Sequence, residues 1–307
     1  MREVLIIGGG VIGLTTGVLL AEDGVRVRVW SREGVAGTTS AVAGGLCWPY
    51  RIEPAQRAAE WAVRSFATFA ELARRPSATG VRMRAGTMVD DPPAAEWAAL
   101  VGPRTVAPVV DMTTYLPYLQ RRLEAAGGRF QQRAPRSLDE VADAAPVVVN
   151  CTGLGARELV PDPSLRPVRG QLVVVADPGV EEWYVSAGHG AAESTYVIPQ
   201  PYGVLLGGTA EEDAEDTEPD PATAEAILAR CARVRPELAG AEVLAHRVGL
   251  RPYRPSVRLE TVRLPGGGVC VHHYGHGGAG ITVSWASAED AVRLASEAAI
   301  RRGHDVP

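Results

Sequence analysis

The 307-residue sequence contains no lysine, so its 31 Lys or Arg positions are all arginine. Acidic side chains outnumber these arginines at 36, and the formal net charge is -5 at pH 7. Nucleic-acid binding normally leaves a basic excess or a basic patch in the sequence. We therefore expect neither DNA nor RNA as a partner.

Long apolar runs and paired cysteines are also missing. No apolar stretch approaches the roughly 20 residues that span a bilayer, and the run at residues 4–7 is too short for the core of a signal peptide. The four cysteines, Cys47, Cys151, Cys231 and Cys270, lack the spacing of a zinc site or a redox dithiol. We expect buried thiols, no metal, no membrane partner, and a cytoplasmic, reducing location.

The composition that remains is that of a globular protein. Hydrophobic residues make up 46% and charged residues 22% of the chain, which is close to the usual mix. The length allows a large core, arranged in one large or two interleaved domains.

The first 31 residues predict a βαβ unit. Residues 4–7 form an apolar, β-branched run typical of a strand buried on both faces, residues 11–22 have helical character, and residues 25–30 read as a second strand. Gly24 is placed to end the helix. The unit has the order and size of a nucleotide-binding βαβ motif.

The turn Gly8-x-Gly10-x-x-Gly13 joins this strand to this helix and predicts a dinucleotide site. Gly8 permits the tight turn, Gly10 lets the backbone approach a pyrophosphate, and Gly13 lets helix and strand pack closely. The helix start adds N–H groups and positive potential. We assign Gly8, Gly9, Gly10, Val11, Ile12 and Gly13 to this site.

The end of the second strand leaves the choice of dinucleotide open. The carboxylate that usually holds the adenosine ribose is replaced by Ser31-Arg32-Glu33. Glu33 could take that role if the strand runs further, whereas Arg32 could bind a 2′-phosphate and so indicate NADP.

The rest of the chain predicts a discontinuous α/β fold. Helical patterns cover residues 51–75, 112–126, 222–234 and 286–302, strand patterns cover residues 147–149, 171–176, 195–198, 204–208 and 269–272, and the acidic run 211–220 reads as a solvated loop or helix entry. We expect residues 147–149 to rejoin the first sheet. The predicted domains are a Rossmann-like nucleotide domain of residues 1–50, 111–175 and 262–307, and an α+β substrate domain of residues 51–110 and 176–261 with a mostly antiparallel sheet.

A run near the C-terminus closely resembles the signature of the D-amino-acid oxidase family. It reads Val271-His272-His273-Tyr274-Gly275-His276-Gly277-Gly278-Ala279-Gly280-Ile281-Thr282, followed by Trp285 and Ala288. Three further stretches agree in the order of the family: Thr38-Thr39-Ser40 with Ala43-Gly44-Gly45-Leu46, Asn150-Cys151-Thr152-Gly153, and Gly249-Leu250-Arg251-Pro252 leading to Arg258-Leu259-Glu260. The resemblance covers nearly the whole chain.

The resemblance implies FAD as the cofactor, which makes the nucleotide domain an FAD-binding domain. Ser31 and Arg32 fall where the family contacts the ribose, and the missing carboxylate is a departure from its pattern. The remaining cofactor residues that it implies are Thr38, Thr39, Ser40, Gly44, Gly45, Leu46, Thr152, Gly153, Arg251, Gly277, Gly278, Ala279, Gly280, Ile281 and Thr282. Glycines at positions 275–280 cost backbone entropy that an ordinary helix entry does not require, which favours a close ligand there.

The resemblance also implies the reaction. Arg251 would clamp the substrate carboxylate through two parallel hydrogen bonds, Tyr196 would support the same carboxylate, and the Gly278 carbonyl would accept a hydrogen bond from the amine. Hydride transfer from Cα to flavin N5 then needs no general base if the amine is neutral. The products would be a 2-oxo acid, ammonia and, after reoxidation by dioxygen, hydrogen peroxide.

Several side chains have a structural alternative. His272, His273 and His276 cluster without the spacing of a metal site, Cys47 and Trp48 either pack the core or shape the substrate pocket, and Tyr196 could instead expose its hydroxyl at a strand surface. By the resemblance, Ala192 stands where vertebrate relatives usually have a second tyrosine. The compact segment 186–195 argues against a long lid.

The charged residues near the expected substrate site indicate the substrate class. No arginine lies near residues 186–196, and His189 is the only weak exception, so we expect neutral or basic side chains. A D-aspartate oxidase or a glycine or sarcosine oxidase is the alternative within the family. Alternatives of another class are an NADP-dependent reductase, indicated by Arg32, and a flavin-binding protein without turnover. A homodimer is an open alternative to a monomer.

Overall fold

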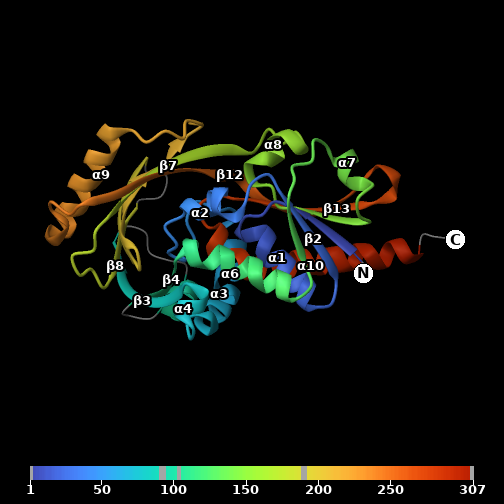
Figure 1. Cartoon of the computed structure of the whole chain (residues 1–307), viewed down its shortest axis with the longest axis horizontal. Helices are drawn as coiled ribbons and strands as arrows, with labels where there is room; N and C mark the ends of the chain where they lie inside the picture. The colour runs from blue at the N-terminus through green and yellow to red at the C-terminus, as the bar shows by residue number, and fades with distance from the viewer. Residues whose placement is uncertain (1–2, 90–94, 102–104, 188–191, 305–307) are drawn as a thin grey trace.

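The computed structural model of the protein describes residues 3–89, 95–101, 105–187 and 192–304. One long sheet runs through it (Figure 1). Its first part is parallel, in the order β5 (Arg129–Gln132), β2 (Arg26–Ser31), β1 (Glu3–Ile7), β6 (Val147–Asn150) and β13 (Val269–His276). The predicted return of residues 147–149 to the first sheet is confirmed, with Val4 opposite Val147.

The second part of the sheet is mostly antiparallel. It continues from β13 through β12 (Val243–Arg263), β7 (Arg166–Val175), β10 (Gly203–Thr209), β9 (Glu193–Gln200) and β8 (Trp183–Ser186) to β3 (Val81–Met88) and β4 (Val106–Val110). The strand β3 pairs with β8 in parallel, and the short β11 (Glu211–Glu212) pairs with β7. The predicted fold class, a Rossmann-like part joined to a mostly antiparallel one, is confirmed.

The strands β7 and β12 join the two parts of the sheet. In Figure 1 they run along the top of the view, from α9 (Pro221–Val234) toward β13. Because β12 pairs with β7 over most of the length of β7 and with β13 at its far end, no break separates the two parts. The division at residues 51–110 and 176–261 therefore stays a prediction.

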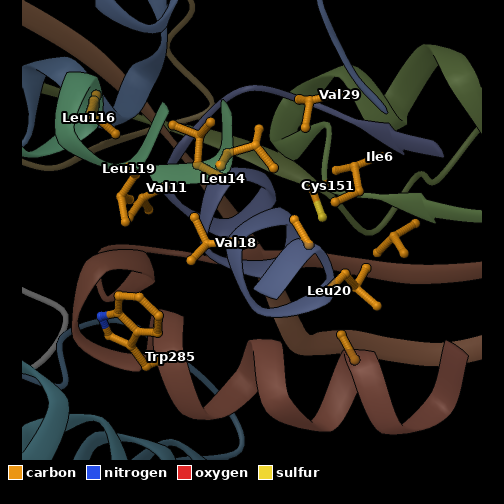
Figure 2. Close-up of a cluster of buried hydrophobic side chains, with 14 of the residues drawn as sticks. Ile6, Val11, Leu14, Val18, Leu20, Val29, Leu116, Leu119, Cys151 and Trp285 are labelled. Atoms are coloured by element: carbon orange, nitrogen blue, oxygen red, sulfur yellow. The ribbon is translucent and has the colours of Figure 1, made fainter. Parts of the chain in front are cut away.

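A layer of helices packs beside the parallel strands. The helix α1 (Val11–Glu22) lies between α6 (Met112–Ala125) and α10 (Gly280–His304), and α3 (Ala55–Leu72) packs on α10. Figure 2 shows Val11, Leu14 and Val18 of α1 between Leu116 and Leu119 of α6 and the Trp285 indole of α10. The indole donates to the Tyr115 hydroxyl at 3.0 Å, so its polar atom is satisfied inside the core.

Shorter helices complete the chain. They are α2 (Thr39–Val42), α4 (Pro76–Thr79), α5 (Ala95–Val101), α7 (Leu138–Ala142) and α8 (Ala156–Leu159), with 3-10 turns at Val35–Gly37, Gly153–Gly155, Pro236–Leu238 and Pro265–Gly267. No helix among the described residues combines the length and the apolar character needed to cross a bilayer.

Two predicted boundaries differ from the structure. The last helix begins at Gly280 rather than at residue 286, because its first turns bury Val283, Ala286 and neighbouring residues, and this packing outweighs the low helix propensity of Thr282 and Val283. The acidic run is not simply a solvated loop: Glu211–Glu212 extend the sheet as β11, and only the Asp220 cap of α9 fits the predicted helix entry.

Candidate active site

The glycine-rich segments near both chain ends line one cavity. Its volume is about 770 Å³, and it lies beyond the carboxyl ends of β1 and β6, where open α/β sheets bind ligands. Gly8 and Gly10 line it from the N-terminal segment, and Gly277 and Gly278 line it from the C-terminal one. All the predicted site residues line this cavity except Gly13 and Ala279.

The first turn has the geometry expected of a phosphate cradle. Gly8 has a φ of +111°, and a Cβ there would lie 2.3 Å from the Cys151 carbonyl oxygen. A Cβ on Gly13 would lie 1.9 Å from the Gly8 oxygen, so Gly13 serves close packing of helix on strand rather than ligand contact. The Val11 N–H at the helix start donates to Ser40 Oγ at 3.0 Å, which ties two of the predicted cofactor segments together.

The segment 44–48 is held from two sides. Gly45 has a φ of +84°, and a Cβ there would lie 1.9 Å from the Val110 oxygen. The Gln200 amide donates to the Gly44 and Val110 oxygens at 3.0 and 3.2 Å. On the other side, Thr282 Oγ1 accepts from the Trp48 N–H at 2.9 Å and donates to the Trp48 oxygen at 3.0 Å.

The end of the cavity beside Arg32 contains charges of both signs. Arg32 is mostly exposed, and its guanidinium lies 3.5 Å from a Glu158 carboxylate oxygen. Glu33 also lines the cavity, although β2 ends at Ser31. Glu33 therefore reaches the cavity from the turn after β2, and its contact with the ribose stays a prediction.

Arg251 projects over a glycine in the neighbouring strand. Its Nη1 donates to the Thr209 oxygen at 3.0 Å and approaches the Arg169 oxygen at 3.5 Å. A Cβ on Gly170 would lie 2.4 Å from the same nitrogen, so glycine is required for the guanidinium to lie there. Within the described part of the chain, no carboxylate forms an ion pair with Arg251.

Tyr196 lies close to Arg251 and does not expose its hydroxyl on an outer strand surface. Burial raises the pKa of its hydroxyl to about 12, and the positive charge of Arg251 opposes that rise. The ring crosses β10, where Cβ atoms on Gly207 and Gly208 would lie 1.8 and 2.6 Å from its atoms. The alternative of a surface tyrosine was wrong.

The C-terminal glycines pack on a residue that the sequence did not single out. A Cβ on Gly278 would lie 2.6 Å from Tyr50 Cδ1, and one on Gly277 would lie 1.9 Å from the Arg51 oxygen. Tyr50 lines the cavity, and its hydroxyl accepts from Arg51 Nε at 3.1 Å. Its place directly after Trp48-Pro49 was the available signal. Ala279 is fully buried beneath the turn.

Apolar side chains form the wall near Tyr196. Trp48, Met88, Leu172, Val185 and Ile198 line this part of the cavity, and Trp48 packs against Trp97 and Trp183, each with 5.8 Å between ring centroids. Cys47 is fully buried and does not line it. Of the two residues proposed to shape the pocket, only Trp48 lies in its wall.

The clustered histidines are buried and neutral. Burial lowers the pKa of His276 to about 3 and that of His272 to about 4, and it lowers the pKa of His273 well below its ordinary value. The rings of His273 and His276 meet edge to face at 4.9 Å. Among the described residues, no three potential metal ligands come together.

The fold and the cavity define a dinucleotide-dependent α/β enzyme. The chain matches the model of the FAD dependent oxidoreductase family DAO over residues 3–108 and 104–294. The protein therefore belongs to this family of FAD-dependent oxidoreductases, and its cofactor is FAD.

The chain is similar to curated relatives over nearly its whole length. It is 58% identical to a D-amino-acid oxidase of Streptomyces coelicolor, covering 96% of this chain and 97% of the relative. It is 47% identical to a D-amino-acid oxidase of Rubrobacter xylanophilus, covering 97% of each. The crystal structure of glycine oxidase from Geobacillus kaustophilus has the same fold, with a TM-score of 0.78 at 19% identity over 97% of this chain and 95% of that one.

Proposed function

We propose that this FAD-dependent enzyme oxidises D-amino acids with neutral or basic side chains to 2-oxo acids, with release of ammonia and hydrogen peroxide. The observation that carries the proposal is the full-length similarity to two bacterial D-amino-acid oxidases. The cavity supports it, because Arg251 lies at one end without a carboxylate partner among the described residues.

The residues around the cavity fit FAD. Gly8 and Gly45 line its wall at positions where a Cβ would clash with the Cys151 and Val110 backbone oxygens, and the start of α1 offers N–H groups toward a pyrophosphate. We assign the pyrophosphate to Gly8–Ile12 and Ser40, the adenosine end to Ser31, Arg32 and Glu33, and the flavin to Gly44–Leu46 and Gly277–Thr282. Thr152 and Gly153 complete the wall beside the first turn.

Arg251 and Tyr196 hold the substrate carboxylate in this proposal. A guanidinium offers two parallel donors that match a carboxylate, which fixes orientation as well as charge. Because burial raises the pKa of the Tyr196 hydroxyl to about 12, the hydroxyl stays protonated and remains a donor at neutral pH. The Gly278 carbonyl accepts from the amine, so two contacts direct the substrate Cα.

The chemistry needs orientation more than acid–base catalysis. When bound, FAD supplies the acceptor for the Cα hydride, and dioxygen takes up the electrons as hydrogen peroxide. The carboxylates that line the cavity, Glu33 and Glu158, both lie at its adenosine end. No carboxylate therefore faces the amine from the described residues, which fits transfer from a substrate with a neutral amine.

The apolar wall favours a neutral side chain. Trp48, Met88 and Val185 offer no partner for a second carboxylate. An acidic preference is the alternative, since the chain is also 34% identical to human D-aspartate oxidase, over 96% of this chain and 95% of that protein. Arg32, the basis of the NADP alternative, pairs with Glu158 instead.

The visible spectrum of the purified protein tests the proposal. We expect flavin bands that bleach when D-alanine is added without oxygen, return when oxygen is admitted, and do not respond to L-alanine. A yellow protein that no D-amino acid bleaches would be a flavin-binding protein without this activity. A homodimer and a cytoplasmic location stay predictions, the first testable by sedimentation of the holoenzyme.

A further inference from the structure

The segment that links β10 to β11 contains an extra residue beside the substrate end of the cavity. Gly207 of β10 lies opposite Leu172 of β7, and Glu211 of β11 lies opposite Arg169 of the same strand. Residues 208–210 therefore face only two residues of β7. Such a bulge interrupts the regular ladder of hydrogen bonds and redirects the groups around it.

Thr209 lies inside this bulge and forms hydrogen bonds in two directions. Its Oγ1 accepts from the N–H of Gln171 in β7 at 3.0 Å, and its backbone oxygen accepts from Nη1 of Arg251 in β12 at 3.0 Å. Thr209 is buried and does not line the cavity. It can therefore affect a bound substrate only through the residues that it holds.

Among the described residues, the Thr209 oxygen is the nearest hydrogen-bond partner of the Arg251 guanidinium. The backbone oxygen of Arg169 lies further away, at 3.5 Å from Nη1. The guanidinium crosses Gly170, where a Cβ would lie 2.4 Å from the same nitrogen. The position of Nη1 therefore depends on where the bulge places the Thr209 oxygen.

We propose that Thr209 is a positioning residue for the substrate clamp: its hydroxyl fixes the bulge, and the bulge fixes the oxygen that orients the Arg251 guanidinium. The inference rests on the proposed function and deepens it. Two parallel hydrogen bonds between a guanidinium and a carboxylate tolerate little misplacement. A small shift of the Thr209 oxygen is therefore felt at the substrate carboxylate.

Thr209→Val removes the acceptor and keeps the branched shape of the side chain. The buried Gln171 N–H then loses this partner, and the bulge must move to satisfy it. We expect the Kd of propionate, which has the carboxylate of a substrate but no amine, to rise on the order of fivefold. Thr209→Ser keeps the acceptor and should bind propionate within about twofold of wild type.

Two comparisons separate positioning from a general loss of stability. Thr79 is also a buried threonine whose hydroxyl accepts from a backbone N–H, that of Val81 at 3.2 Å, and it does not line the cavity. Thr79→Val should therefore leave the Kd of propionate unchanged. Thr209→Val should slow flavin reduction by subsaturating D-alanine in the wild-type background but not in an Arg251→Ala background, because its effect passes through that guanidinium.

The experiment titrates propionate into the oxidised holoenzymes and follows the visible bands of the flavin. Weaker binding in Thr209→Val, with wild-type binding in Thr209→Ser and Thr79→Val, supports the inference. A Kd within about twofold of wild type in Thr209→Val overturns it. An equal slowing of flavin reduction with and without Arg251 also overturns it.

A second variant covers a valine variant that does not fold. Thr209→Cys carries a thiol, which is a weak acceptor, and should bind propionate more weakly than Thr209→Ser. Equal binding in these two variants overturns the inference. If D-alanine fails to reduce the wild-type flavin, the proposed function itself falls, whereas the propionate titration still tests the clamp.

Discussion

At the scale of single residues, Arg251 differs from Arg247, Arg254 and Arg258 of its strand because, among the described residues, it hydrogen-bonds to backbone oxygens alone. Arg254 and Arg258 both approach Asp162, and Arg247 lies over the ring of Tyr202. Arg251 contacts the Thr209 and Arg169 oxygens instead. Its charge is thereby held in place without being neutralised, which suits a guanidinium that must receive a carboxylate.

Arg251→Ala should raise the apparent KM for D-alanine by more than about tenfold, because losing one member of a buried charge pair costs about 2 to 5 kcal/mol. Oxygen consumption at a series of D-alanine concentrations measures this apparent KM. Arg247→Ala is the matched control, since this arginine contacts Tyr202 and does not line the cavity. Unchanged kinetics in the Arg251 variant would remove it from the substrate site.

The buried ring of His276 makes the stability of the fold depend on pH. Its folded pKa of about 3 lies below the ordinary 6.5, so the neutral buried ring contributes stability above pH 6.5, and this contribution is lost as the pH falls toward 3. We expect His276→Gln to flatten the slope of unfolding free energy against pH by up to about 1.4 kcal/mol per pH unit between pH 6 and 4.

Denaturant unfolding of the holoenzyme at several pH values measures that slope. His246→Gln, at an exposed position of β12, is the control and should keep the wild-type slope. An identical slope in wild type and the His276 variant would mean that the buried ring is already charged or is hydrated in the folded protein.

At the scale of elements, the sequence predicted those helices and strands whose limits are set by residues close in the chain. The first strand, helix and strand follow from apolar periodicity and from Gly8 and Gly24, and the structure agrees to within a residue. The start of α10 was missed because Thr282 and Val283 disfavour a helix locally, and only burial against neighbouring elements compensates.

The motifs of the site could be predicted from the sequence, but the contacts between distant segments could not. The glycine signatures located most of the cavity wall, but the place of Tyr50 and the contact of Arg251 with the Thr209 oxygen depend on segments that meet only after folding. Glu33 was a candidate only for a longer strand, whereas in the structure it lines the cavity from the turn that follows β2.

The strand β9 contributes both to the substrate end of the cavity and to the support of the cofactor-binding turn at residues 44–46. Tyr196 and Ile198 line the cavity, and Gln200, on the same side of the strand, holds the Gly44 and Val110 oxygens. Gln200→Leu should therefore weaken FAD binding severalfold, because two acceptors lose their donor and a buried one costs about 1–3 kcal/mol. Fluorescence titration of the apoprotein with FAD measures this.

Thr79→Val is the control for Gln200→Leu. The Thr79 hydroxyl donates to the Leu72 oxygen at 2.9 Å and accepts from the Val81 N–H at 3.2 Å, and Thr79 does not line the cavity. Both variants should lose stability, but only the Gln200 variant should lose affinity for FAD. Equal affinities in the two variants would show that the 44–46 turn keeps its shape without the amide.

At the scale of the whole molecule, the cofactor cavity gathers segments from most of the chain. Its wall includes residues from β1, β7, β9, β12 and the start of α10, so a bound ligand contacts the beginning, middle and end of the sequence at once. The strands β7 and β12 join the parallel and the antiparallel part of the sheet without a break. We therefore expect that loosening one part of the sheet also loosens the other.

FAD should therefore stabilise the entire fold in one transition rather than one half of it. A ligand that binds the native state alone adds about 2.7 kcal/mol at a hundredfold excess over its Kd. We expect a single thermal transition in both apo- and holoprotein, with the midpoint rising as free FAD is increased. Two separated transitions, of which FAD shifted only one, would instead assign residues 51–110 and 176–261 to a domain that unfolds on its own.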